Sequence, residues 1–130
     1  MDSRKFEKHW LILVVENVYE TRAGIDTLLK ASGYRVAFAG ATAIQSTRPE
    51  RPDLILMSGA DLPDSVTIGR MRKEAAVGDE VPVVVFCARD VPEGEEVAVD
   101  PNVYLTNPDN FNQLRSLIER LLREASQRGR

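Results

Sequence analysis

Short apolar runs alternate along the chain with segments of helical periodicity. The run Trp10–Val15 is apolar throughout, which is typical of a strand that is covered on both faces of a sheet. Four later runs also have the length and composition of strands, namely Arg35–Ala39, Leu54–Met57, Val81–Phe86 and Val103–Leu105. The pattern therefore predicts five strands.

The remaining apolar positions recur at helical spacing. The segments with this spacing are Tyr19–Ser32, Ala41–Thr47, Ser65–Ala76 and Phe111–Ala125. The last is the clearest, because its leucine and isoleucine residues fall on one face. We expect Gly33 to end the first helix and Asp109 to cap the last.

Strands that alternate with helices predict right-handed crossovers and a parallel sheet. Five such strands suit a flavodoxin-like, doubly wound α/β domain with strand order 2-1-3-4-5 and helices on both faces. The segment Pro92–Asp100 interrupts the pattern with a proline, a glycine and four acidic residues, so any helix there should be short, frayed or absent. We divide the chain into an N-terminal extension (1–9), the domain (10–125) and a C-terminal tail (126–130).

Composition narrows the class of protein. A chain of 130 residues is the length of one domain, and a net charge of −3 argues against a broad electrostatic grip on nucleic acid. Cys87 is the single cysteine and His9 the single histidine, so an internal disulfide and a multi-histidine metal site are excluded. Because no apolar run has the length of a membrane helix and no signal peptide is evident, we expect a cytoplasmic protein.

From about Leu11 to Leu122 the sequence resembles the receiver domain of bacterial two-component response regulators. The motifs that carry the resemblance are ILVVEN (12–17), GYRV (33–36), PDLILM (52–57), LPD (62–64), VPVVVFCA (81–88) and YLTNP (104–108). The resemblance implies a phosphorelay role, in which a partner histidine kinase passes a phosphoryl group to an aspartate. It also implies a magnesium ion among the carboxylates of the site.

The residues at the positions of the family's site depart from its pattern. The acidic pair falls on Glu16 and Asn17, the acceptor aspartate on Ser58, the hydroxyl residue on Cys87 and the lysine on Asn107. Only Glu16 keeps its chemical type. Because three carboxylates become one, we expect magnesium binding to be lost or weak, and we expect no other metal or cofactor.

These substitutions indicate a pseudo-receiver, a stand-alone signalling module without enzymatic activity. It would act by protein–protein contact on a sensor kinase, another regulator or a second copy, without aspartate phosphorylation. Two alternatives stay open. One is phosphorylation at Asp61 or Ser58, although the Ser58 hydroxyl would need a general base and Glu16 is the only carboxylate placed near it. The other is a flavodoxin-like binder of a small ligand, although the loop after the first strand lacks the glycine of a phosphate cradle.

Charge distribution points to one face as an interaction surface. The segment Arg89–Asp100 holds five acidic residues and one basic residue, whereas Arg115–Arg130 holds five arginines and two glutamates. Both segments should flank the fifth strand, so opposite charges on one face favour a homodimer or a charged partner. We take Tyr104, Arg115 and Glu119 as switch or interface candidates, with Tyr104 at the position of the family's switch aromatic. Cys87 is interpreted as buried and inert.

Overall fold

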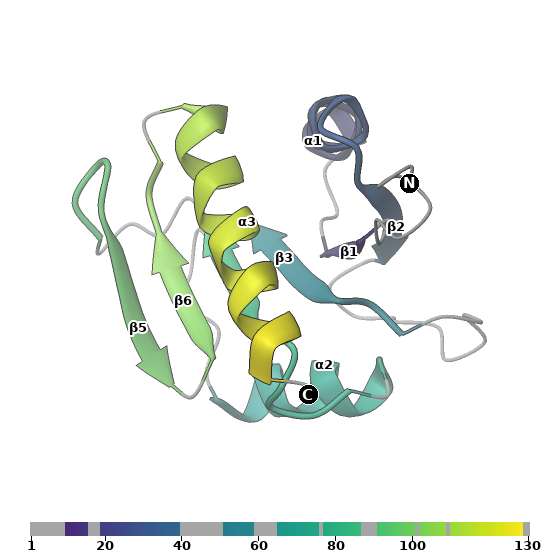
Figure 1. The fold of residues 1–130 in the computed structure, drawn as a ribbon, viewed down its shortest axis with the longest axis vertical. Helices are drawn as coiled ribbons and strands as arrows, with labels where there is room; N and C mark the ends of the chain where they lie inside the picture. The colour runs from purple at the N-terminus through teal and green to yellow at the C-terminus, as the bar shows by residue number, and fades with distance from the viewer. Residues whose placement is uncertain are drawn as a thin grey trace, which may run out of the picture.

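The computed structural model describes residues 10–15, 19–39, 51–58, 65–75, 77–86, 91–100, 102–108 and 110–128. A six-stranded sheet has the order β2-β1-β3-β4-β6-β5. Its strands are β1 (Leu11–Val15), β2 (Arg35–Ala39), β3 (Leu54–Ser58), β4 (Val83–Phe86), β5 (Glu96–Asp100) and β6 (Val103–Thr106). The helices are α1 (Tyr19–Ala31), α2 (Ser65–Glu74) and α3 (Phe111–Arg128) (Figure 1).

The parallel part of the sheet has the predicted arrangement. β2, β1, β3, β4 and β6 are neighbours in that order and all their pairings are parallel, so β6 is the predicted fifth strand. The flavodoxin-like fold is therefore confirmed, with element bounds that differ from the predicted ones by at most three residues. The predicted helix Ala41–Thr47 lies outside the described residues.

β5 corrects the prediction of a five-stranded, wholly parallel sheet. It pairs antiparallel with β6 and forms the edge of the sheet in the described part of the chain. The strand forms because two β-branched residues, Val97 and Val99, alternate with other side chains at a period of two residues. The density of acidic residues and the nearby Pro92 and Gly94 concealed this pattern in the sequence. Asn102, at φ 63°, adopts the left-handed conformation in the turn to β6, which asparagine tolerates better than most residues.

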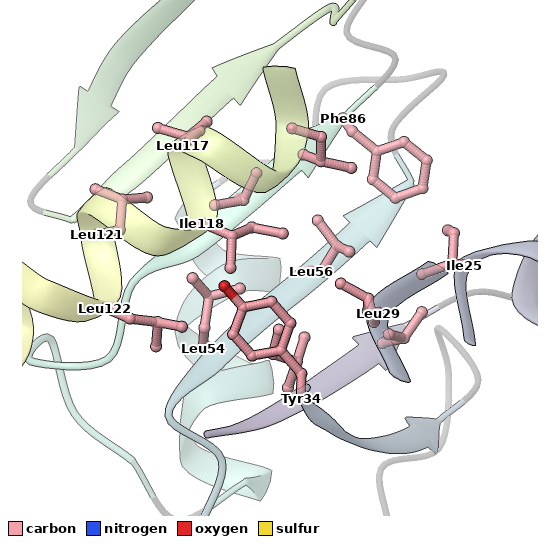
Figure 2. Close-up of a cluster of buried hydrophobic side chains, with 14 residues drawn as sticks. Ile25, Leu29, Tyr34, Leu54, Leu56, Phe86, Leu117, Ile118, Leu121 and Leu122 are labelled. Atoms are coloured by element: carbon pink, nitrogen blue, oxygen red, sulfur yellow. The ribbon is translucent and has the colours of Figure 1, made fainter. Parts of the chain in front are cut away.

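Two apolar clusters cover the two faces of the sheet. α2 packs on one face, and α1 and α3 pack on the other. β1 shows why its sequence is apolar throughout: Leu13 and Val15 face α2, whereas Ile12 and Val14 face α1 and α3. The buried residues of α3 form one stripe: Leu114, Leu117, Ile118, Leu121 and Leu122 (Figure 2). Burial of these side chains is the main force that holds α3 on the sheet.

α1 ends as the sequence predicts. Gly33 has φ 94°, a conformation that costs other residues free energy, and its N–H donates to the carbonyl of Lys30 over 3.0 Å. The N–H of Tyr34 donates to the carbonyl of Leu29 over 3.1 Å, which completes a Schellman motif. Leu29 and Tyr34 are both buried in the same cluster, so the helix end also contributes to the core.

α3 begins at Phe111, as predicted, but its cap is not the predicted residue. The side-chain Oδ1 of Asn110 accepts a hydrogen bond from the N–H of Gln113 over 3.1 Å, so Asn110 is the N-cap. Asp109, which we predicted for this role, lies outside the described residues. No helix within the described ranges combines the length and the apolar character needed to cross a membrane.

Polar side chains tie the strands together at their amino ends. Oδ2 of Asp53 accepts a hydrogen bond from the N–H of Leu11 over 2.8 Å, which joins β3 to β1. Arg72 of α2 is only 7% exposed, and its guanidinium donates to the carbonyls of Val81 (2.9 Å) and Asn102 (3.3 Å). These bonds connect α2 to the segments that enter β4 and β6.

Candidate functional site

The carboxyl ends of three central strands lie side by side. Ser58 pairs with Phe86, and Phe86 pairs with Thr106, so β3, β4 and β6 end in one row. In open α/β sheets ligands bind at this edge, beside the point where the winding reverses. Ser58 is therefore where the sequence placed it. The other residues predicted near it lie outside the described part of the chain: Glu16, Asn17, Asp61 and Cys87.

Asn107, which the resemblance places at the lysine position, is bonded to the segment that precedes β5. Its Nδ2 donates to the carbonyl of Val91 over 3.2 Å, and its backbone N–H donates to the carbonyl of Glu95 over 3.3 Å. Its backbone carbonyl accepts from the N–H of Gly94 over 2.6 Å. The buried Thr106 adds a bond from its Oγ1 to the Glu95 carbonyl over 3.0 Å. Asn107 and Thr106 thus hold this segment in place, a role that the sequence did not reveal.

Among the described residues, this edge offers few oxygen atoms that could bind a magnesium ion. Ser58 offers a half-buried hydroxyl, Phe86 offers no donor, and the Thr106 hydroxyl is already bonded to a carbonyl. The amide nitrogen of Asn107 is a hydrogen-bond donor, whereas magnesium takes carboxylate, phosphate and water oxygens. Nowhere in the described ranges do three histidine, cysteine or acidic side chains gather as a metal site.

An open hollow of about 770 Å³ lies between α3 and the start of β5. Its wall includes Glu95, Glu96, Thr106 and Arg120. Arg120 and Glu96 form an ion pair across it, with Nη2 and Oε1 2.6 Å apart. Glu96 of β5 and Arg120 of α3 therefore meet on the α3 side of the sheet, and this part of their opposite charge is paired within the chain. Neither Glu96 nor Arg120 was singled out from the sequence, because only the fold brings them together.

The three interface candidates occupy other positions on this side of the sheet. Tyr104 is half-buried and packs against the cluster under α1 and α3. Arg115 and Glu119 lie near Tyr34, whose pKa is raised to about 12, first by burial and then by the charge of Glu119, while Arg115 opposes the rise. Figure 2 shows the Tyr34 ring reaching toward α3. Arg115 and Glu119 are thus on the flank of α3 away from Arg120 and the hollow.

Comparison with known proteins finds likeness in structure only. No protein-family model matches the sequence, and no curated protein matches it. The structure of NtrX from Brucella abortus in complex with ATP aligns over 93% of this chain, with a TM-score of 0.64 and 17% identity. This chain spans 28% of the length of NtrX.

Two isolated receiver domains align over nearly their whole length. The receiver domain of sensor histidine kinase PA1611 from Pseudomonas aeruginosa, solved with magnesium in its active-site cleft, gives a TM-score of 0.59 and 21% identity over 88% of this chain and 98% of that one. The signal receiver domain of a histidine kinase from Syntrophus aciditrophicus gives 0.56 and 19%, over 88% and 91%. The order of the parallel strands and these alignments together show that the chain has the fold of a receiver domain.

Proposed function

We propose that this chain is a receiver-like signalling module that acts by protein–protein contact, without phosphorylation of an aspartate and without catalysis of its own. The observation that carries the proposal is the chemistry of the carboxyl edge. Ser58 stands at the end of β3, where the resemblance places the acceptor aspartate. Asn107 occupies the position where the resemblance places the lysine, and its side-chain amide donates a hydrogen bond to the Val91 carbonyl.

The physical reason lies in the charge that phosphoryl transfer needs. A carboxylate can attack phosphorus and form an acyl phosphate, whereas a serine hydroxyl is a weak nucleophile until a base removes its proton. The incoming phosphoryl oxygens also need cations to neutralise them, which a metal ion and a lysine supply in this type of chemistry. A neutral Ser58 and a neutral Asn107 supply neither the nucleophile nor the cation.

A module without this chemistry has to act through its surface. The side of the sheet that carries the hollow is the best candidate, because Glu96 and Arg120 expose opposite charges there (36% and 50% of their side chains). A partner with paired charges, such as a kinase, another regulator or a second copy, can compete for this ion pair. The proposal therefore places the contact on the flank of α3 that faces β5.

The first experiment asks whether the protein accepts phosphate. The protein is incubated with acetyl phosphate and magnesium and then weighed intact by mass spectrometry, beside a receiver domain that is phosphorylated under the same conditions. We expect no gain in mass. We also expect none for Ser58→Asp, because a new carboxylate at Ser58 still lacks the cation that Asn107 does not provide.

A gain in mass by the unmodified protein would contradict the proposal, and its location would decide between the alternatives. Loss of the gain in Asp61→Asn or in Ser58→Ala would assign the phosphate to that residue. A gain in mass by Ser58→Asp but not by the unmodified protein would show that a carboxylate at position 58 is the single group missing for phosphorylation. A flavin or nucleotide released from the purified protein by denaturation would instead support a flavodoxin-like binder.

A further inference from the structure

β5 forms a hydrogen-bonding edge with no strand beyond it in the described part of the chain. It is the outermost strand beside β6 in Figure 1. The N–H of Asn107 donates to the carbonyl of Glu95, so these two residues face each other across the ladder. Hydrogen-bonded pairs recur at every second residue of an antiparallel ladder, so the N–H and carbonyl of Val97 also point toward β6, where Val97 pairs with Leu105. Alternation then turns the backbone N–H and carbonyl of Glu96 and Ala98 away from the sheet.

The side chains of β5 add an apolar pair to this edge. Val97 is 44% exposed and Val99 is 46% exposed, and they are two of the three large apolar side chains that the described residues expose. Val97 pairs with Leu105, which faces the α2 side of the sheet, and Val99 follows at the register shift that β5 makes between Ala98 and Asp100. A strand added to β5 would cover both valines and satisfy the outward backbone groups.

The negative charge of β5 decides which kind of strand can pair with it. The sequence of β5, EVAVD, holds two acidic residues and no basic residue, so pairing two copies along this edge would bring like charges together, which destabilises a sheet. The wall of the hollow next to β5 also carries Glu95 and Glu96, with only Arg120 to offset them. A second copy is therefore a poor occupant, whereas a segment with basic side chains complements this edge.

We propose that β5 accepts an extended basic segment of a partner protein as an added strand. In that segment arginine or lysine alternates with β-branched residues. The β-branched side chains cover Val97 and Val99, and the basic side chains on the other face reach Glu96 and the hollow under α3. This mode of recognition goes beyond the proposed function, because it concerns the edge of the sheet and does not depend on whether Ser58 is phosphorylated.

The test uses a short, capped and fluorescently labelled peptide in which arginine and valine alternate. Its binding to the unmodified protein is followed by fluorescence anisotropy at moderate salt. Three comparison peptides separate the contributions: one with glutamate in place of arginine, one with the same residues in blocks, and one N-methylated at every residue, so that neither of its edges can donate a ladder bond. We expect saturable binding of the alternating peptide and at least about tenfold weaker binding of the other three.

Protein variants locate the site. Ala98→Pro removes an outward N–H and leaves the bonds to β6 in place, so binding should fall by about tenfold or more. Exchange of both Val97 and Val99 for asparagine should weaken binding by about threefold or more. The matched control is Leu28→Asn on α1, which alters the third exposed apolar residue (42% exposed) and should change binding by less than about twofold. Each variant is first shown to melt cooperatively.

Three outcomes would overturn the proposal. They are equal binding of the N-methylated peptide, unchanged binding by Ala98→Pro, and a concentration-dependent dimer of the unmodified protein that Ala98→Pro abolishes. The first two would reduce the interaction to charge alone, and the third would make a second copy the occupant. Should Ala98→Pro fail to fold, hydrogen–deuterium exchange of the unmodified protein decides, because the peptide should protect 96–100 and leave 19–31 unchanged. Absence of that protection would also overturn the proposal.

Discussion

The two ends of the parallel strands differ in how they use polar side chains. At the amino ends, the charged side chains of Asp53 and Arg72 bind backbone groups of neighbouring segments. At the carboxyl ends, the described side chains of Ser58, Thr106 and Asn107 are neutral. Charge is thus present where it joins strands and absent at the described positions where receiver chemistry would use it. The polar contacts that hold this fold together are therefore separable from the chemistry that can be built on it.

Arg72 shows why the amino end tolerates a buried cation. A guanidinium offers five N–H donors in a fixed plane, so it can serve several carbonyls at once. Here it serves Val81 and Asn102, and its Nη1 lies 3.6 Å from the exposed carboxylate of Asp79. Without such partners, burial of the charge would be costly. Arg72 therefore acts as a connector between α2, β4 and β6.

The largest effect is expected from Arg72→Met, which keeps an unbranched apolar side chain and removes the guanidinium donors. The carbonyls of Val81 and Asn102 lose their bonds to the guanidinium, so the free energy of unfolding should fall by about 2–4 kcal/mol. Urea unfolding followed by circular dichroism measures the loss. Lys73→Met is the control at the next position, where the side chain is exposed, and should change stability by less than about 0.5 kcal/mol. A loss below about 1 kcal/mol in Arg72→Met would show that the bonds of Arg72 contribute little to joining α2 to the strands.

Alkaline pH should weaken the contact between Tyr34 and α3. The pKa of Tyr34 is raised from 10.0 to about 12, so the folded protein keeps a phenolic proton that the unfolded chain releases. This contribution to stability is complete below about pH 10 and is lost as the pH rises toward about 12, by roughly 2–3 kcal/mol at most.

Tyr34→Phe isolates this effect from the other groups that titrate at alkaline pH. The difference in unfolding free energy between the two proteins should move in favour of Tyr34→Phe between about pH 9 and about pH 12. Parallel curves for the two proteins over that range would show that the buried hydroxyl does not couple folding to pH. Tyr34 directly precedes β2 at the amino end of the sheet, but its side chain packs in the cluster under α3, so the experiment measures the packing of α3 and not a bond between strands.

At the carboxyl end, Asn107→Lys tests whether Asn107 is structural. Lysine cannot keep the amide's bond to the Val91 carbonyl in the same geometry, so stability should fall by about 1 kcal/mol. Thermal unfolding measures it, with Asn112→Lys on the exposed start of α3 as control. An increase in stability on Asn107→Lys would indicate anionic surroundings at this edge and would contradict the neutral site described above.

Much of the fold could be predicted because it depends on local pattern. Five fully buried residues in β1, the helical stripe of α3 and the left-handed Gly33 each leave a signal within a few residues of sequence. β5 left a signal too, in the alternation of Val97 and Val99, but acidic residues and turn formers obscured it. The main error in the predicted fold, the missing strand β5, thus arose because its acidic composition hid its alternating valines.

The candidate site was predictable only in part, because its contacts are not local. Ser58 followed from the end of a strand, and its place in the row with Phe86 and Thr106 agrees. The bond from Asn107 to Val91 spans a segment whose strand was missed, so nothing in the sequence indicated it. Likewise, the residues facing the hollow depend on the rotation of α3, which places Arg120 beside β5 and Arg115 near Tyr34.

The smallest effect is expected for the ion pair between Glu96 and Arg120. Both side chains are partly exposed, so solvent screens their attraction and ordering two long side chains offsets part of it. A double-mutant cycle with Glu96→Gln and Arg120→Gln should give a coupling of about 0.2–1 kcal/mol that declines as salt is added. A coupling well above this range would mean that the hollow shields the pair as the amino end shields Arg72. In that case charged groups would be shielded from solvent at both ends of the strands. A partner would then have to break a strong ion pair to enter between α3 and β5.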